Sequence, residues 1–128
     1  MKKLLCLIPL LIMLFAGLVW AGEKSLEFSW DQVISSDFAG WKLYMSETPG
    51  DYTGVAPIDI PYTGQSTYES TQVIISPDGE THIYYFVLTA YDDEMPSLES
   101  GYSNEVSQEI DFEAPGEPFS LTVTVVTE

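Results

Sequence analysis

The chain has 128 residues, of which 20 are Asp or Glu and only four are lysine, so its formal net charge is −16. This balance argues against nucleic acid as a partner, because four cations cannot form a basic surface. One cysteine and one histidine are too few for a Cys/His zinc site, a Cys–His nucleophile pair or a disulfide framework. Apolar residues make up 45% of the chain and aromatic residues 13%, which is enough for one domain with a hydrophobic core.

The first 21 residues are predicted to be an export signal. Lys2 and Lys3 form a basic start, the run from Leu4 to Val19 is apolar, and Ala21 provides a small residue for signal peptidase. We therefore expect an exported protein, secreted or at the cell surface, with no membrane segment after cleavage. An uncleaved membrane anchor is the alternative, because about 17 apolar residues are just enough to cross a bilayer.

The mature chain would contain no cysteine, since Cys6 is removed with the signal. It would keep two lysines against 20 acidic residues, so its net charge is 2 − 20 = −18. Such a charge favours solubility and makes copies repel one another, and added salt weakens that repulsion. The simplest interpretation is a solvated acidic surface.

The mature chain is predicted to fold as β-strands. Apolar and polar residues alternate between closely spaced turn signals, which is typical of a β-sandwich or barrel. The first strand covers Leu26 to Trp30 and buries its even-numbered residues. The second strand covers Gly40 to Ser46 and buries its odd-numbered residues, among them Trp41.

The middle of the chain is predicted to contribute two strands. Thr48 to Asp51 contain Pro-Gly and form a turn. A short edge strand follows at Ile58 to Tyr62, because Pro57 and Pro61 make this segment unsuitable for the centre of a sheet. The next strand covers Thr71 to Ser76, with Val73 and Ile75 pointing inward.

The longest predicted strand covers Thr81 to Tyr91. Its residues are almost continuously apolar, which indicates a central position with both faces partly covered. An acidic loop, Asp92 to Gly101, then leads to a last alternating strand at Tyr102 to Ile110.

Four segments resemble strands B, C, F and G of a fibronectin type III module. They are Trp30, Gly40-Trp-Lys-Leu-Tyr44, Tyr84-x-Phe-x-Leu-x-Ala90 and Glu99-Ser-Gly-Tyr-Ser-Asn-Glu-Val106. The resemblance implies an all-β fold, an immunoglobulin-like antiparallel β-sandwich over residues 22–111. It also implies that Trp30 is the core tryptophan of strand B and that the Tyr84 hydroxyl pins the corner before strand F. Two departures are a longer turn before Tyr84 and a missing strand A.

Strand A has no counterpart at the start of the mature chain. Only Gly22 to Lys24 precede the first strand, whereas a strand usually has five or six residues. The first strand would therefore expose unpaired backbone groups and an apolar groove. Residues 112–128, a Pro-rich linker and a C-terminal strand, instead resemble the entry and strand A of a further module. Their predicted buried face consists of Phe119, Leu121, Val123 and Val125.

One hypothesis is that this C-terminal strand is donated to another copy of the chain. In the family's topology strands A and G run in the same direction, so a return to the chain's own groove would stretch the link from Asp111 to Pro118, about 26 Å long at most. Donation along a head-to-tail stack would build a fibre. The alternatives are a parallel fold-back onto the chain's own edge, a loose tail, or a longer protein cut after one module.

The sequence has few residues in the patterns that are typical of an enzyme active site. A G-x-S-x-G motif is lacking, and a sandwich of this size leaves little room for the paired carboxylates of a glycosidase. A single histidine at the start of a strand, His82, is more often a surface residue than a catalyst. We therefore expect a protein that is not an enzyme and has no cofactor.

Calcium and carbohydrate are the two small ligands that the sequence suggests. The acidic loop offers the hard oxygen ligands that suit Ca²⁺, although their spacing does not match an EF-hand and a solvated charge run is the simpler interpretation. These metal candidates are Asp92, Asp93, Glu94 and Glu99. Tyr52, Tyr62 and Tyr68 would stack on a sugar if exposed, or else cover the edge of the sandwich, which we favour.

The sequence thus predicts a secreted or cell-surface adhesion, scaffold or surface-assembly module. Its expected partners are proteins, including copies of itself. The alternative is a small ligand-binding module for carbohydrate or Ca²⁺.

Overall fold

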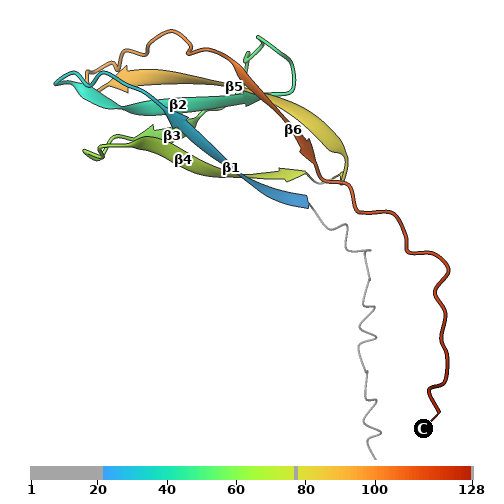
Figure 1. Cartoon of the computed structure of the whole chain (residues 1–128). Coiled ribbons are helices and arrows are strands. Elements are labelled where there is room, and N and C mark those ends of the chain that lie inside the picture. The colour runs from blue at the N-terminus through green and yellow to red at the C-terminus, as the bar shows by residue number, and fades with distance from the viewer. Residues whose placement is uncertain (1–21, 77, 128) are drawn as a thin grey trace, which may run out of the picture.

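Six strands form two antiparallel sheets in the computed structural model, which describes residues 22–76 and 78–127 (Figure 1). The strands are β1 (Gly22–Trp30), β2 (Phe38–Ser46), β3 (Ile58–Pro61), β4 (Tyr68–Ser76), β5 (Thr81–Asp92) and β6 (Val106–Asp111). β1 pairs with β4 in one sheet, and the other sheet has the order β3-β2-β5-β6. These packed sheets confirm the predicted all-β sandwich. Over the same residues, no helix has the length and apolar character needed to span a membrane.

The hydrophobic core lies between the two sheets. Its buried cluster consists of Leu43, Ile74, Tyr84, Phe86, Ile110 and Phe112. Strand β5 occupies the centre of its sheet, between β2 and β6. Its opposite face is covered as well, since Val87 and Thr89 are only 4% and 3% exposed. This agrees with the central, two-sided burial that its apolar sequence predicts.

Strand β4 faces the core with the opposite set of residues from the predicted one. Val73 and Ile75 are 51% and 59% exposed on the outer face, whereas Ile74 and Ser76 are buried. The prediction that Val73 and Ile75 point inward is wrong. Three consecutive apolar residues fit either face of a strand, and the buried hydroxyl of Ser76 is satisfied by a hydrogen bond to the carboxylate of Asp78.

The last strand starts later than the sequence predicts. β6 begins at Val106, four residues after the expected start at Tyr102. Ser103 interrupts regular pairing, because its backbone N–H donates to the Leu88 carbonyl and its side-chain oxygen accepts from the Leu88 N–H. The chain therefore follows β5 here through a mixture of backbone and side-chain hydrogen bonds rather than a regular strand ladder.

Edge strand β3 is short and approaches β2 closely. A Cβ atom on Gly40 would lie 2.6 Å from the carbonyl oxygen of Ile60, so only glycine fits at this position. The strand ends at Pro61, which has no N–H to offer another strand.

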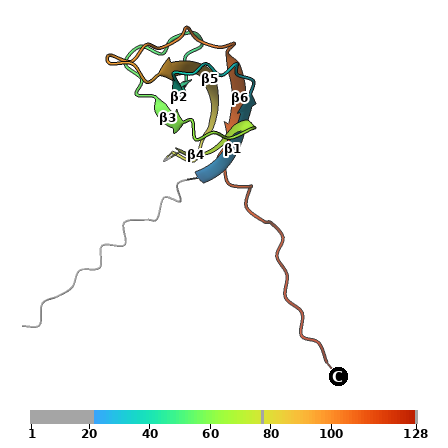
Figure 2. The same ribbon diagram turned by 90° about the vertical axis from the view of Figure 1, so that its left-hand side faces the viewer.

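Strand β1 begins and β6 ends at the same pole of the sandwich. A Cβ atom on Gly22 would lie 2.6 Å from Cδ1 of Phe112, the buried residue that follows β6. From this pole the chain leads away from both sheets (Figures 1 and 2). Residues 113–127, which we call the C-terminal tail, belong to no strand, and all their side chains are exposed.

Candidate functional site: the open edge of strand β1

Strand β1 is paired along only one of its two edges. Its residues lie opposite β4 from end to end, with Gly22 facing Ser76 and Trp30 facing Tyr68. Within residues 22–76 and 78–127, no strand lies on its other side. Backbone N–H and C=O groups along a nine-residue strand therefore point away from the sheet. Such an edge is a template for an additional strand.

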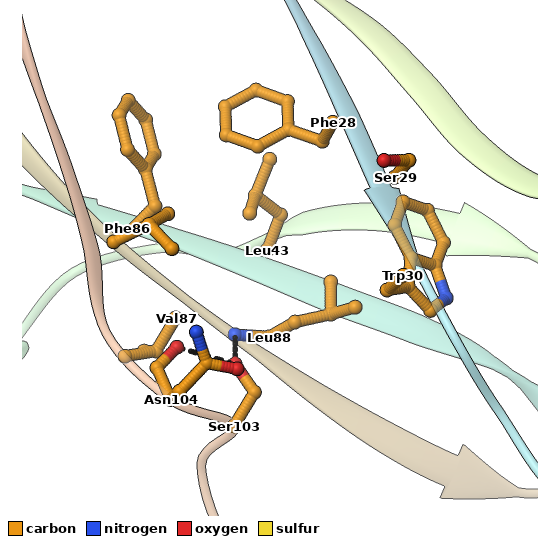
Figure 3. A pocket seen from close by; sticks show the side chains of 10 residues that line it. Phe28, Ser29, Trp30, Leu43, Phe86, Val87, Leu88, Ser103 and Asn104 are labelled. Atoms are coloured by element: carbon orange, nitrogen blue, oxygen red, sulfur yellow. Dashed lines mark hydrogen bonds between the residues drawn. The ribbon is translucent and has the colours of Figure 1, made fainter.

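An apolar groove runs beside this open edge, between β1 and β6. The residues that line it include Leu26, Phe28, Trp30, Phe86 and Val106. Figure 3 shows Phe28 and Phe86 above Leu43, with Trp30 at one end of the pocket. The Phe28 and Phe86 rings pack edge to face with centroids 4.8 Å apart. The inward side chains of β1 therefore contact the core and are half-buried along the groove.

The apolar residues of the C-terminal tail have no packing partner in the described structure. Phe119, Leu121, Val123 and Val125 are 90%, 95%, 96% and 83% exposed. Singly exposed apolar side chains are ordinary, but an exposed alternating row of them is a feature of interaction surfaces. Within the described residues, no other segment covers the predicted buried face of this tail.

The two tryptophans that the sequence assigned structural roles lie in one aromatic cluster. Trp41 is fully buried, and its ring contacts Trp30, Tyr62 and Tyr68 at centroid distances of 5.1, 5.9 and 5.2 Å. Its Nε1 donates to Oε1 of Gln32 over 3.2 Å. The Trp30 Nε1 is buried without a hydrogen-bond partner among the described residues. Tyr62 and Tyr68 thus cover the side of the sandwich, as the sequence analysis favoured.

Tyr84 is buried, as its place at the start of a core strand requires, and is 7% exposed. Desolvation and the nearby carboxylates of Glu47 and Asp78 raise the pKa of its hydroxyl. No hydrogen bond to this hydroxyl occurs within the described ranges. The corner-pinning role therefore stays a prediction.

The one histidine lies between two carboxylates at the surface. His82 Nε2 is 2.8 Å from Asp78 Oδ2, and its Nδ1 is 2.8 Å from Glu47 Oε1. The hydrogen bond with Asp78, with a smaller contribution from Glu47, raises the pKa of His82. The imidazole thereby links the β4–β5 turn to the residue that follows β2, and this is a structural role.

The predicted metal ligands of the acidic loop divide into separate groups. Carboxylate oxygens of Asp92 and Glu94 come within 4.8 Å of one another and of Asp37, which the sequence analysis did not include. Asp93 and Glu99 are not part of this cluster. Asp92 Oδ1 also accepts hydrogen bonds from the backbone N–H groups of Glu94 and Leu98, at 3.2 and 2.8 Å. This carboxylate therefore holds the loop in shape.

Glu99 lies on the outer face of the larger sheet instead. Its carboxylate accepts hydrogen bonds from the hydroxyls of Tyr44 and Thr89, and Lys42 Nζ lies 3.6 Å away. Burial opposes ionisation of Glu99, but these hydrogen bonds and the lysine hold its pKa below the usual value. Desolvation and Glu99 raise the pKa of Tyr44 to about 12.

The same face contains a tyrosine cluster that sequence reasoning missed. Tyr52 is only 6% exposed, in agreement with the favoured interpretation that it packs against the sandwich rather than facing a sugar. Its ring packs against Tyr44 and Tyr102, and its hydroxyl donates to Glu105 over 2.6 Å. The signal was weak, because Tyr52 belongs to a Gly/Pro-rich loop whose path periodicity does not define.

Comparisons of the chain with protein-family models, with curated proteins and with solved structures find no match.

Proposed function

We propose that this protein is an exported, non-catalytic module of the fibronectin type III kind that serves adhesion, scaffolding or surface assembly. The observation that carries the proposal is the unpaired edge of β1 beside an apolar groove. An open edge binds an extended protein segment through main-chain hydrogen bonds, while alternate side chains of that segment enter the groove.

Strand order supports the type III assignment. By the sequence resemblance, β1, β2, β5 and β6 are strands B, C, F and G, and the pairs β2–β5 and β5–β6 lie in one sheet. Strand A of such a module would pair with β1 along the edge that is open. The site of protein binding is then the place where this module is incomplete.

The proposed export rests on the predicted signal, whose residues lie outside the described part of the chain. A mature charge of −18 suits an exterior in which salt screens repulsion between copies.

The non-catalytic character is supported by how the polar side chains are used. His82, Asp92 and Glu105 each hold neighbouring parts of the chain in place, through Asp78, Leu98 and Tyr52 respectively. The groove beside β1 is lined mainly by apolar side chains, which suits burial of a strand rather than proton transfer.

A peptide experiment tests the proposed edge. Dilute mature chain, residues 22–128, is mixed with a synthetic peptide of residues 117–127, and hydrogen exchange of the β1 amides is measured. We expect slower exchange in β1, with no effect from a control peptide carrying lysines in place of Leu121 and Val123. Unchanged exchange with the first peptide would show that the edge is not a strand-binding site.

Calcium binding is the second candidate, favoured by the approach of Asp37, Asp92 and Glu94. Titration calorimetry with CaCl₂ distinguishes the two candidates. A saturable heat that disappears in Asp37→Asn supports a ligand-binding module. If calcium gives neither heat nor a change in Tm, the cluster is only part of the loop.

A further inference from the structure

We propose that the groove of β1 receives residues 119–126 from a second copy of this chain, added antiparallel to β1 in a head-to-tail stack. The proposal rests on the proposed function and names the partner that binds the open edge of β1. The partner is the chain itself, because its described residues include both an apolar groove without a strand in it and an exposed segment with alternating apolar side chains.

The chemistry of the segment matches the groove. Phe119, Leu121, Val123 and Val125 alternate with Ser120, Thr122 and Thr124, so an extended strand has one apolar face and one hydroxyl face. Residues 119–127 contain no ionisable side chain. An uncharged strand can approach a partner of the same strong negative charge with less repulsion than an acidic one.

Alternation fixes which residues lie opposite one another. The even-numbered residues of β1 from Leu26 to Trp30 are half-buried over the core, and those between them are exposed. An antiparallel donor that buries its odd-numbered residues therefore pairs odd with even positions. When the donor strand begins at the Trp30 end of β1, Phe119 lies opposite Trp30, Leu121 opposite Phe28, and Val123 opposite Leu26. On the outer face, Ser120 then lies opposite Ser29.

The chain cannot place this strand antiparallel on its own β1 in that register. Phe112 is fixed in the core at the pole where β1 begins. From Phe112 to Phe119 the chain reaches at most about 25 Å. The antiparallel strand must start beside Trp30, and β1 is about 27 Å long from Gly22 to Trp30. The link is too short even before it turns back.

A neighbouring copy removes this limit. Each copy has its donor at the Gly22 pole and the start of its acceptor site at the opposite pole, next to Trp30. Stacking the Gly22 pole of one copy on the Trp30 pole of the next brings donor and acceptor together. Because donor and acceptor are different surfaces, repetition of this contact gives an open chain of copies rather than a closed dimer.

One local change accompanies docking. Ser120 has a φ of 57° in the free tail, in the left-handed region that serine rarely adopts. Joining a strand moves Ser120 into the extended region, which serine tolerates well. The backbone at this residue is therefore more relaxed in the donated strand than in the free tail.

Disulfide trapping tests the direction and the register. The mature chain has no cysteine of its own, so Ser29→Cys with Ser120→Cys reports only the intended pair. We expect mild oxidation to give a ladder of covalent oligomers, since these positions face each other on the outer side. The matched variant, Ser29→Cys with Thr124→Cys, tests a parallel fold-back onto the same chain. It should give no cross-linked monomer.

Two tail variants complete the test without disturbing the fold, because both residues are exposed in the single copy. Val123→Lys puts a charge on the face that enters the groove and should lower the oligomer yield at least tenfold, whereas Thr124→Lys should leave it within about twofold. An intrachain disulfide, or no oligomer ladder from the Ser29/Ser120 pair, overturns self-donation. If the free peptide still slows exchange in β1, the edge binds strands and only the identity of the partner is wrong.

Discussion

Two of the edge strands in this sandwich, β3 and β1, are of opposite kinds. At β3 the larger sheet ends in a four-residue strand that closes with Pro61, which discourages further pairing. At β1 the smaller sheet ends in nine residues without proline, beside an apolar groove. A single fold thus contains a protected edge and an unprotected one. The difference between these two edges supports the proposal that another strand pairs with β1, beside the groove.

The largest expected effect is a loss of stability on mutation in the buried aromatic cluster around Trp41. Trp41→Ala removes a fully buried ring from the aromatic cluster and should lower the free energy of unfolding by about 3–5 kcal/mol. Leu26→Ala, on the open edge, should cost less than about 2 kcal/mol in dilute solution, because Leu26 is only half-buried there. Urea unfolding measures both. Equal losses would mean that the open edge is as well packed as the core.

Added salt should strengthen self-association through the open edge of β1. Raising the ionic strength from about 0.01 to 0.1 M shortens the screening length from about 30 to 10 Å. Copies of charge −18 then repel less, while contacts between apolar side chains persist. We expect self-association to strengthen several-fold, as measured by light scattering. Weaker association at higher salt would point to ion pairs instead of strand donation.

A smaller effect is expected on the outer face of the larger sheet. Tyr44→Phe removes one hydrogen bond to Glu99 and should cost about 1 kcal/mol of unfolding free energy. In the wild type the folded pKa of Tyr44 is about 12, above the unfolded value of about 10. Its contribution is therefore full below pH 10 and is lost as pH rises toward 12. Alkaline unfolding curves of the two proteins should converge in that range.

The smallest expected effect lies at the turn between β4 and β5. His82 has a raised pKa, so its contribution to stability is full below about 6.5 and is lost as pH rises through the folded value. The pKa of Asp78 is lowered by Ser76 and His82, so its contribution is lost in acid, below its usual value. NMR titration of the single imidazole should show a pKa above 6.5. Asp78→Asn should lower that pKa more than Glu47→Gln, and the reverse order would contradict this geometry.

Much of the fold follows from alternation alone. Alternation of apolar and polar residues locates β1 and β2 and identifies their buried side chains, because the polar residues mark the outer face. The long apolar run of β5 indicates that this strand lies at the centre of its sheet. Alternation fails at Val73-Ile74-Ile75, where every side chain is apolar. There the structure buries Ile74 and Ser76, and the buried Ser76 hydroxyl hydrogen-bonds Asp78, two residues later.

The open edge was predicted on the expectation that signal cleavage leaves three residues before Ser25, fewer than a strand usually has. The structure makes those residues part of β1 itself. Side chains of the acidic loop were not predictable, because loop conformation decides which carboxylates meet. The loop brings Glu99 to the Tyr44 hydroxyl, from which it accepts a hydrogen bond, and brings the carboxylate of Asp92 near that of Asp37. The loop sequence has no periodic pattern from which these contacts could be predicted.

Sedimentation velocity of the mature chain over a wide range of concentration tests self-donation most directly. Strand donation predicts a mass that grows steadily with concentration, without a stop at the dimer, and a strict monomer once residues 112–128 are deleted or Val123 is changed to lysine. A mature chain that stays monomeric at the highest concentration, or that associates equally well without its tail, would contradict it.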